Sequence, residues 1–130
     1  LFYQRGDAAK KELTDSAFNS FSGGEKAMAM YVPLFASVSA QYQKGGASCP
    51  QILALDEAFA GVDDQNISAM FELMGILDFD YIINSQALWG CYACVSDLDI
   101  AEMHHPPNAP VVTILRYHWN GRQRTLEDSL

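Results

Sequence analysis

The sequence predicts an α/β fold with a central, mostly parallel sheet, flanking helices and antiparallel hairpins at the two ends. Two observations support this prediction. Short apolar runs alternate with segments of helical periodicity in the middle of the chain, and hairpin patterns lie near both ends. The chain has 130 residues, of which 49 % are hydrophobic and 18 % are charged. This size and composition are typical of about one ordered domain, which we place over residues 1–130.

The first third of the chain predicts a hairpin, a loop and a long helix. Residues 1–4 and 11–14 flank a polar stretch, as the strands of a hairpin do. Residues 18–24 are rich in turn formers and predict a loop. Residues 25–42 are apolar on nearly every side, so a helix here would be buried on most of its sides, and Pro33 would kink it.

Two short apolar runs predict strands of a parallel sheet. Residues 52–55 form the first run, which ends abruptly in two acids, and residues 81–83 form the second. Continuous apolar runs of this length are typical of strands buried on both faces. Residues 95–100 are the candidate for a third strand.

A helix and a second hairpin complete the predicted elements. Asp63 or Asp64 can cap the helix, because an aspartate side chain accepts hydrogen bonds from the free N–H groups of a first turn. Residues 111–119 and 122–125 flank Asn120-Gly121, a pair that favours the tight turn of a hairpin. The helix has an apolar stripe at helical spacing, made of Ile67, Met70, Phe71, Met74 and Leu77.

The charge balance argues against a DNA-binding role for this chain alone. Sixteen acidic residues against eight basic ones give a net charge of −8. Affinity for nucleic acids comes mostly from Lys and Arg that neutralise phosphates.

The apolar runs are too short to span a bilayer, and an odd count of three cysteines fits a reducing compartment. We therefore expect a cytoplasmic protein without a membrane partner.

Cys91 and Cys94 form a Cys-x-x-Cys pair upstream of His104 and His105, and a metal site is one interpretation of this group. The spacing between Cys94 and His104 does not match the familiar zinc patterns. We favour the interpretation that the cysteines are small apolar residues in or near a buried segment. The adjacent histidines then form an exposed pair before a turn.

Residues 22–26, Ser-Gly-Gly-Glu-Lys, precede the long apolar segment and form a candidate phosphate contact. Gly23 and Gly24 let backbone N–H groups approach an anion closely, and Ser22 adds a hydroxyl. The start of a helix adds unpaired donors and the positive end of its dipole. A Ser-Gly-Gly turn on its own is more often simply the start of a helix, so both interpretations stay open.

Asp56 and Glu57 stand at the carboxyl end of the run 52–55, where open α/β sheets bind their ligands. Asp56 is the candidate Mg²⁺ residue, because hard cations prefer carboxylate oxygens. Glu57 is the candidate general base for an attacking water. Two solvated acids at the end of a strand are the simpler interpretation of the pair taken alone.

The order and spacing of these motifs resemble the C-terminal half of an ABC/SMC-type P-loop NTPase head, as found in SbcC/JetC-like, SMC-related ATPases. Residues 22–26 look like the signature motif in its SGGEK form, residues 52–57 like Walker B, and residues 56–63 like the run into the D-loop. The resemblance implies the use of ATP and Mg²⁺, with Asp56 at the metal and Glu57 as base. It also implies nucleotide contacts from Ser22, Gly23, Gly24, Glu25 and Asp63.

Two features depart from the family pattern. The chain has no Gly-x-x-x-x-Gly-Lys-Ser/Thr, the Walker A motif, which in the family lies in an N-terminal lobe beyond a long coiled coil. Gln86 stands where the family often has a switch histidine; Gln orients a water but cannot take up a proton. Gln86 therefore joins Glu57 as a candidate catalytic residue, and we expect the isolated chain to be inactive.

The resemblance implies three kinds of partner. The first is the Walker A lobe of the same protein, and the second is another head, with which ATP is sandwiched. The third is DNA, bound through the full complex together with a nuclease or kleisin-type subunit, in repair, chromosome organisation or plasmid defence. One alternative is a non-catalytic dimerisation module that keeps the motifs only as a surface. Another is an ABC transporter domain, which the Glu25-Lys26 ending of the signature argues against.

Overall fold

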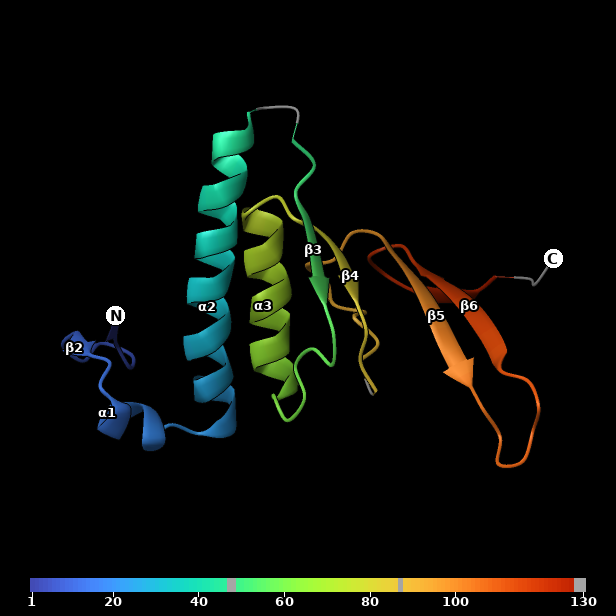
Figure 1. Ribbon diagram of the computed structural model, residues 1–130, viewed down its shortest axis with the longest axis horizontal. Helices are drawn as coiled ribbons and strands as arrows, with labels where there is room; N and C mark the ends of the chain where they lie inside the picture. Colours follow the sequence, from blue (N-terminus) through green and yellow to red (C-terminus); the bar gives the residue numbers. More distant parts are fainter. Residues whose placement is uncertain (47–48, 87, 128–130) are drawn as a thin grey trace.

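Two helices and a parallel strand pair form the centre of the molecule in the computed structural model, which describes residues 1–46, 49–86 and 88–127 (Figure 1). Helix α2 (Gly23–Tyr42) and helix α3 (Asp64–Ile76) lie side by side, and strands β3 (Ile52–Leu55) and β4 (Asp80–Ile83) pack against them. The other elements are β1 (Phe2–Tyr3), β2 (Lys11–Glu12), α1 (Asp15–Asn19), the 3₁₀ turn η1 (Gln43–Gly45), β5 (Leu98–His104), β6 (Thr113–Trp119) and β7 (Arg124–Leu126).

The described strands form three small sheets in place of the large central one that the sequence predicts. Strands β3 and β4 pair in parallel, with Leu53 opposite Tyr81 and Leu55 opposite Ile83. Strands β1 and β2 form the N-terminal hairpin that was predicted. The prediction that residues 95–100 add a third strand to the parallel sheet is wrong. The strand there, β5, begins at Leu98 and belongs to an antiparallel sheet with β6 and β7. The α/β class is correct, while the parallel part has two strands.

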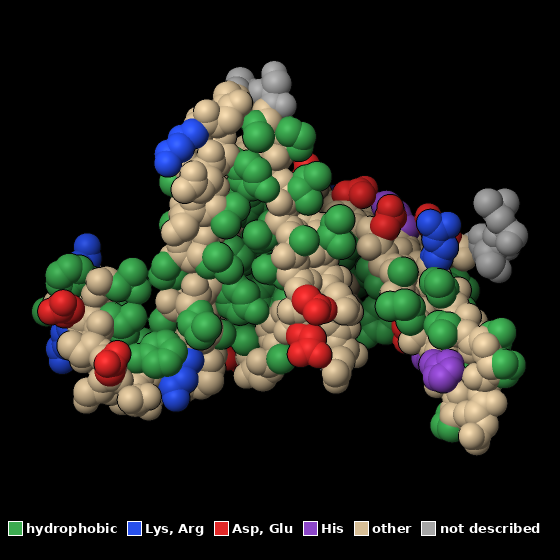
Figure 2. Space-filling model, viewed as in Figure 1, with side chains coloured by type: hydrophobic (Ala, Val, Ile, Leu, Met, Phe, Trp, Pro, Cys, Tyr) green, Lys and Arg blue, Asp and Glu red, His purple; other side chains and the backbone are tan. Residues whose placement is uncertain are grey.

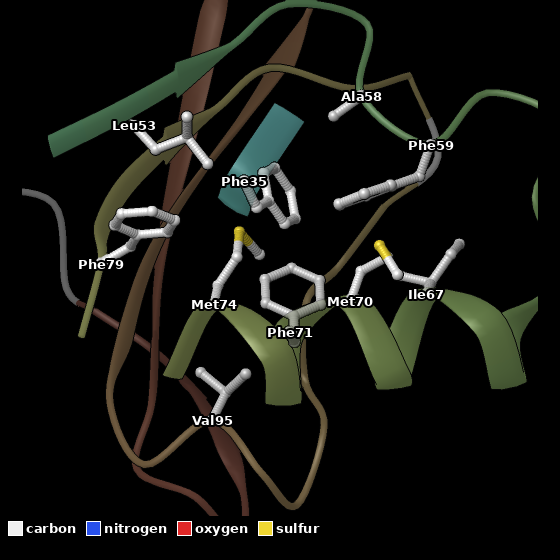
Figure 3. Packing of buried hydrophobic residues seen from close by; sticks show 10 residues of the cluster. All are labelled: Phe35, Leu53, Ala58, Phe59, Ile67, Met70, Phe71, Met74, Phe79 and Val95. Atoms are coloured by element: carbon white, nitrogen blue, oxygen red, sulfur yellow. The ribbon is translucent and has the colours of Figure 1, made fainter. Parts of the chain in front are cut away.

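The core lies between α2, α3 and the strand pair, and its buried side chains are drawn in Figure 3. Phe35 of α2 and Met74 of α3 are both 0 % exposed and point toward each other. Burying a side chain of this kind stabilises the fold by about 1.5–3 kcal/mol. The predicted stripe of α3 supplies four of the core residues, which are Ile67, Met70, Phe71 and Met74.

One face of the β3–β4 pair is open, so the prediction that both strands are buried on two faces is wrong for this chain. Leu53 points into the core and is 7 % exposed. Side chains alternate across a strand, so Ile52 and Ala54 face the other way, and Ile52 is 50 % exposed. Ile82 of β4 is 69 % exposed. We call Ile52, Ala54 and Ile82 the outer face of the strand pair.

Helix α2 begins earlier and is less buried than the sequence predicts. Its buried residues are Gly24, Phe35 and Ser39, while Met30 and Leu34 are exposed. Figure 2 shows hydrophobic side chains on the visible surface over α2 and the strand pair. The helix continues through Pro33 as a single element.

The predicted loop over residues 18–24 is largely helical. Phe18 and Asn19 end α1, and α2 already begins at Gly23, so only Ser20, Phe21 and Ser22 lie between the helices. The reason is that Thr14 and Ser22 each cap the helix that follows, and this lets two helices start within a run rich in turn formers.

The C-terminal sheet contacts the core through Leu98 of β5 and Trp119 of β6. Trp119 donates an indole N–H to the Val95 carbonyl at 2.9 Å, and Val95 is buried. The predicted hairpin is confirmed, since β6 and β7 pair with Trp119 opposite Arg124 and the turn contains Gly121 at φ +84°. The guanidinium of Arg124 stacks 3.6 Å above the Trp89 ring. None of the helices in the described part of the chain is long and apolar enough to cross a membrane.

Candidate functional site

Ser22 caps α2 and is held in a reciprocal pair with Glu25. Its hydroxyl oxygen accepts a hydrogen bond from the Glu25 N–H at 3.2 Å, and its own N–H donates to Glu25 Oε2 at 2.8 Å. Arg5 forms an ion pair with Glu25 at 2.7 Å. The hydrogen bond from the Ser22 backbone, and then the Arg5 guanidinium, lower the pKa of Glu25. The Glu25 carboxylate therefore stabilises the first turn of α2. The Ser22 hydroxyl accepts one hydrogen bond in this cap, and its hydrogen can still donate another.

Gly23 and Gly24 bring this helix start against the segment that follows β3. A Cβ at Gly23 would lie 3.5 Å from the Gly61 carbonyl oxygen, which is an ordinary contact. A Cβ at Gly24 would lie 2.5 Å from Asn66 Nδ2, which is a clash. A side chain at position 24 would therefore displace the side chains of Asp63 and Asn66, and the first turns of α2 and α3 adjoin each other.

Asp63 is the N-cap of α3, as the sequence predicts. Its Oδ1 accepts a hydrogen bond from the Asn66 N–H at 3.0 Å, and its Oδ2 accepts one from Asn66 Nδ2 at 2.6 Å. The backbone hydrogen bond from Asn66, followed by the side-chain one, lowers the pKa of Asp63. The carboxylate predicted to contact nucleotide thus already has a structural role at the boundary of the two helices.

Asp56 follows β3 directly and is paired with the residue that follows β4. Asn84 donates an Nδ2–H hydrogen bond to Asp56 Oδ1 at 2.8 Å. The two strands end in register, with the Asn84 N–H bonded to the Leu55 carbonyl at 2.9 Å. The second oxygen of Asp56 accepts no side-chain or backbone hydrogen bond from the described residues. Asp56 is exposed, and a carboxylate oxygen of this kind suits the hard ligand set of Mg²⁺.

Glu57 occupies a strained turn at the mouth of a cleft. Its φ is +49°, and that of Phe59 is +62°, values that side chains larger than Gly rarely adopt. The cleft has a volume of about 640 Å³ and is lined by both predicted catalytic residues, Glu57 after β3 and Gln86 after β4. Its wall continues through the segment 58–62 and through Trp89. The structure therefore brings Glu57 and Gln86 to one cavity, where a water could lie between a carboxylate and an amide.

Three contributors to this region were not singled out from the sequence. Asn84 could have been found, because it follows a predicted strand at the same sheet edge as Asp56. Tyr92 donates its hydroxyl to Asp64 Oδ1 at 2.7 Å, and burial, reinforced by that hydrogen bond, strongly raises its pKa. Tyr31 of α2 accepts a hydrogen bond from the Phe59 N–H at 3.3 Å. These last two contacts join distant segments and have no signal in local sequence.

Cys91 is partly buried and lines the cleft with Glu57, whereas Cys94 is exposed. Neither cysteine, nor His104 or His105, is hydrogen-bonded to Asp56 or Glu57 within the described residues. Cys94 contacts the Ser68 carbonyl at 3.6 Å, and Cys91 contacts that of Trp89, also at 3.6 Å. His104 pairs with Glu102 at 3.0 Å, and His105 lies 3.1 Å from the Ala109 carbonyl.

A group of acids around His118 lies on the C-terminal sheet and was also missed. Asp99 and Glu127 each place a ligand-type atom within 4.8 Å of the imidazole. Asp99 forms a 3.0 Å contact with the imidazole Nδ1, and Asp97 lies 3.7 Å from Nε2. All three acids are exposed, and the arrangement is that of a charged surface cluster.

The comparison with protein families falls on the segment that carries the site. Residues 2–75 match the family model described as SbcC/RAD50-like, Walker B motif. That range includes Ser22, Gly24, Asp56, Glu57 and Asp63, and it ends before Asn84 and Gln86. The chain has no significant match to any curated protein or to any solved structure.

Proposed function

The chain belongs to the SbcC/RAD50-like family defined by its Walker B motif, and on this basis we propose that it is the C-terminal lobe of an ATPase head. In this proposal the lobe supplies the signature motif, Walker B and the D-loop to ATP-dependent head engagement and hydrolysis. The observation that supports it best is the meeting of Asp56, Glu57, Asn84 and Gln86 at the carboxyl ends of β3 and β4.

The two acids are given different tasks. The left-handed turn at Glu57 (φ +49°) takes its side chain to the cleft, while Asp56 is bonded to Asn84. Asp56 would hold Mg²⁺, which supplies charge neutralisation for the phosphates of ATP when it is bound. Glu57 would take a proton from the attacking water, and the Gln86 amide would orient that water by hydrogen bonding.

The signature segment is assigned to a nucleotide held by another head. Ser22 caps α2, and it is not among the residues that line the cleft with Glu57. The glycines that follow it, Gly23 and Gly24, adjoin Gly61 and Asp63. A chain without a Walker A motif has no phosphate cradle of its own for this hydroxyl to meet. We therefore assign Ser22 and the Gly23 and Gly24 amides to the ATP of the opposing head.

The outer face of the strand pair is the proposed contact with the Walker A lobe of the same protein. Ile52 and Ile82 are half or more exposed there, although parallel strands are usually covered on both faces. Helices of a second lobe packed on this face would cover it, and strands of that lobe would extend the sheet at the free edges of β3 and β4. Binding of DNA is assigned to the complete assembly, because this lobe carries a net charge of −8.

The second candidate is a dimerisation module in which nucleotide is not hydrolysed. One observation favours it: the exposed Gln86, not a histidine, lines the cleft together with Glu57. The two candidates differ in whether the full-length protein hydrolyses ATP. The experiment below separates them.

The test compares two variants of the full-length protein, Glu57→Gln and Asp56→Asn. Glu57→Gln should still bind ATP and engage heads while hydrolysis falls by about 10²–10⁴-fold, the usual contribution of a general base. Asp56→Asn should instead weaken Mg²⁺-dependent ATP binding, because an amide is a poorer ligand for a hard cation. Nucleotide affinity and single-turnover hydrolysis are the measurements.

Glu72→Gln is the matched control, since Glu72 is an exposed acid on α3 outside the cleft. It should leave both measurements unchanged. Hydrolysis by Glu57→Gln at the wild-type rate would show that the base lies elsewhere. No Mg²⁺-dependent hydrolysis by the wild-type protein itself would favour the dimerisation module. Normal Mg·ATP binding by Asp56→Asn would remove the metal assignment.

A further inference from the structure

The turn that carries Glu57 holds two residues in the left-handed region of backbone space. Glu57 has φ +49° and Phe59 has φ +62°. For a bulky side chain such as Phe this conformation is a genuine outlier. Such a turn persists only where its surroundings hold it in place.

Phe59 is the anchor of this turn. Its ring is 4 % exposed and lies between Tyr31 of α2, with centroids 5.0 Å apart, and Phe71 of α3, with centroids 5.9 Å apart. On the other side of the turn, the neighbouring Ala58 bonds to the segment after β4, with its N–H donated to the Asn84 carbonyl at 3.1 Å. The side chain of Glu57 has no hydrogen-bond partner among the described residues, so its position depends on these neighbours.

The Phe59 N–H donates to the hydroxyl of Tyr31 at 3.3 Å, in a partly buried setting. The bond joins the Glu57 turn to α2 at a backbone atom. Tyr31 lies about two and a half helical turns after Ser22 on the same helix. A rigid displacement of the start of α2 therefore moves the Tyr31 hydroxyl relative to the Phe59 N–H.

We propose that Tyr31 is a positioning residue for hydrolysis, whose hydroxyl holds the Phe59 backbone and thereby fixes the direction of the Glu57 carboxylate. This inference rests on the proposed function of Glu57 as base. Because Ser22 is assigned to the ATP of the opposing head, Tyr31 also links occupancy of that site to the catalytic turn of this chain. Removal of the hydroxyl leaves the Phe59 N–H without its partner and lets the strained turn relax.

The experiment uses the full-length protein with Tyr31→Phe, which keeps the ring and removes the hydroxyl. Tyr42→Phe is the matched control: Tyr42 lies on the same helix, and its hydroxyl likewise bonds to backbone, the Ile52 carbonyl at 2.6 Å. Tyr31→Phe should lower kcat roughly 2- to 10-fold, the effect of one lost neutral hydrogen bond, with KM for ATP unchanged. Tyr42→Phe should leave kcat unchanged.

Hydrogen–deuterium exchange of the backbone over residues 57–62 is the second measurement, since it reports on the turn without requiring turnover. Exchange there should be faster in Tyr31→Phe than in wild type, and unchanged in Tyr42→Phe. A melting curve for each variant verifies folding. A kcat that falls equally in both variants would indicate general destabilisation and would overturn the assignment of Tyr31.

Glu57→Gln in the same assays distinguishes this inference from the function on which it rests. If Glu57→Gln abolishes hydrolysis while Tyr31→Phe has wild-type kcat and exchange, the inference fails and the proposed function stands. If Glu57→Gln hydrolyses ATP like wild type, the proposed function fails, and the role of Tyr31 in positioning a base fails with it.

Discussion

Gly24 lies so close to Asp63 that a Cβ at position 24 would be 2.6 Å from the Asp63 Oδ2 atom. The two segments that we propose as signature motif and D-loop are therefore in contact at the first turns of α2 and α3. The hydrogen bonds from Asn66 hold the Asp63 carboxylate in this position. A motif whose glycines are usually explained by the approach of a phosphate here has a second, structural reason for one of them.

Gly24→Ala should therefore destabilise the full-length protein, because the methyl group displaces the Asp63 and Asn66 side chains at the N-cap of α3. Loss of an N-cap costs about 0.5–2 kcal/mol, which the helix propensity of alanine offsets in part. The matched control is Gly75→Ala in α3, where a Cβ would meet nothing within 4 Å. Alanine favours helix over glycine by about 1 kcal/mol, so Gly75→Ala should be neutral or stabilising. Chemical denaturation of the two variants gives the comparison. Equal stability of Gly24→Ala and wild type would show that the contact with Asp63 and Asn66 relaxes without cost.

The local features of the fold were predictable from the sequence because they depend on neighbours along the chain. The stripe of α3 and its Asp63 cap follow from spacing and from side-chain chemistry, and the structure has both. The start of α2 at Gly23 was missed because Ser22 forms a reciprocal cap with Glu25, which converts a turn-like run into a helix start.

The open faces could not be predicted, because apolar runs such as residues 52–55 indicate burial without saying what supplies it. The runs that contain Ile52 and Ile82 have the apolar composition that is typical of buried strands, yet both side chains are exposed in this chain.

In the candidate site, the order of the motifs indicated Asp56 and Glu57 from the sequence. The parallel pairing of β3 and β4 places Asn84 beside Asp56. The bond from Phe59 to Tyr31 depends on how α2 packs, so it required the structure.

The isolated chain should have negligible ATPase activity. It has no Walker A motif, so the lysine and backbone amides that cradle the β- and γ-phosphates are missing from the sequence. Steady-state phosphate release measured with the purified chain, Mg²⁺ and ATP is the assay. Magnesium-dependent turnover that disappears in Glu57→Gln would contradict this expectation and would show that the chain binds ATP in another way.

Ser22→Arg should block engagement of two heads in the full-length protein while ATP binding to each head stays nearly unchanged. The reason is that the Ser22 hydroxyl is assigned to the opposing head, where a large cation has no room beside the phosphate. Head engagement is measured by ATP-dependent dimerisation, and binding is measured with a fluorescent nucleotide.

Thr14→Ala is the matched control for that experiment. Thr14 caps α1 by accepting a hydrogen bond from the Ala17 N–H at 3.2 Å, so its loss removes a helix cap outside the signature segment. It should lower stability by about 1 kcal/mol and leave engagement intact. If Ser22→Arg lost nucleotide binding and engagement together, the assignment of Ser22 to the opposing head would be wrong.

His118 should make the stability of the C-terminal sheet depend on pH. Its hydrogen bond to Asp99, and then the charges of Asp97, Asp99 and Glu127, raise the pKa of His118 above 6.5. A raised pKa in the folded state means that folding favours the protonated ring. The stabilisation is therefore complete below pH 6.5 and is lost as the pH rises through the raised value.

His118→Gln should remove this part of the pH dependence of the melting temperature. His105→Gln should keep it, because His105 has no carboxylate within ion-pair distance among the described residues. Identical pH profiles for wild type and His118→Gln would show that the cluster contributes nothing to stability.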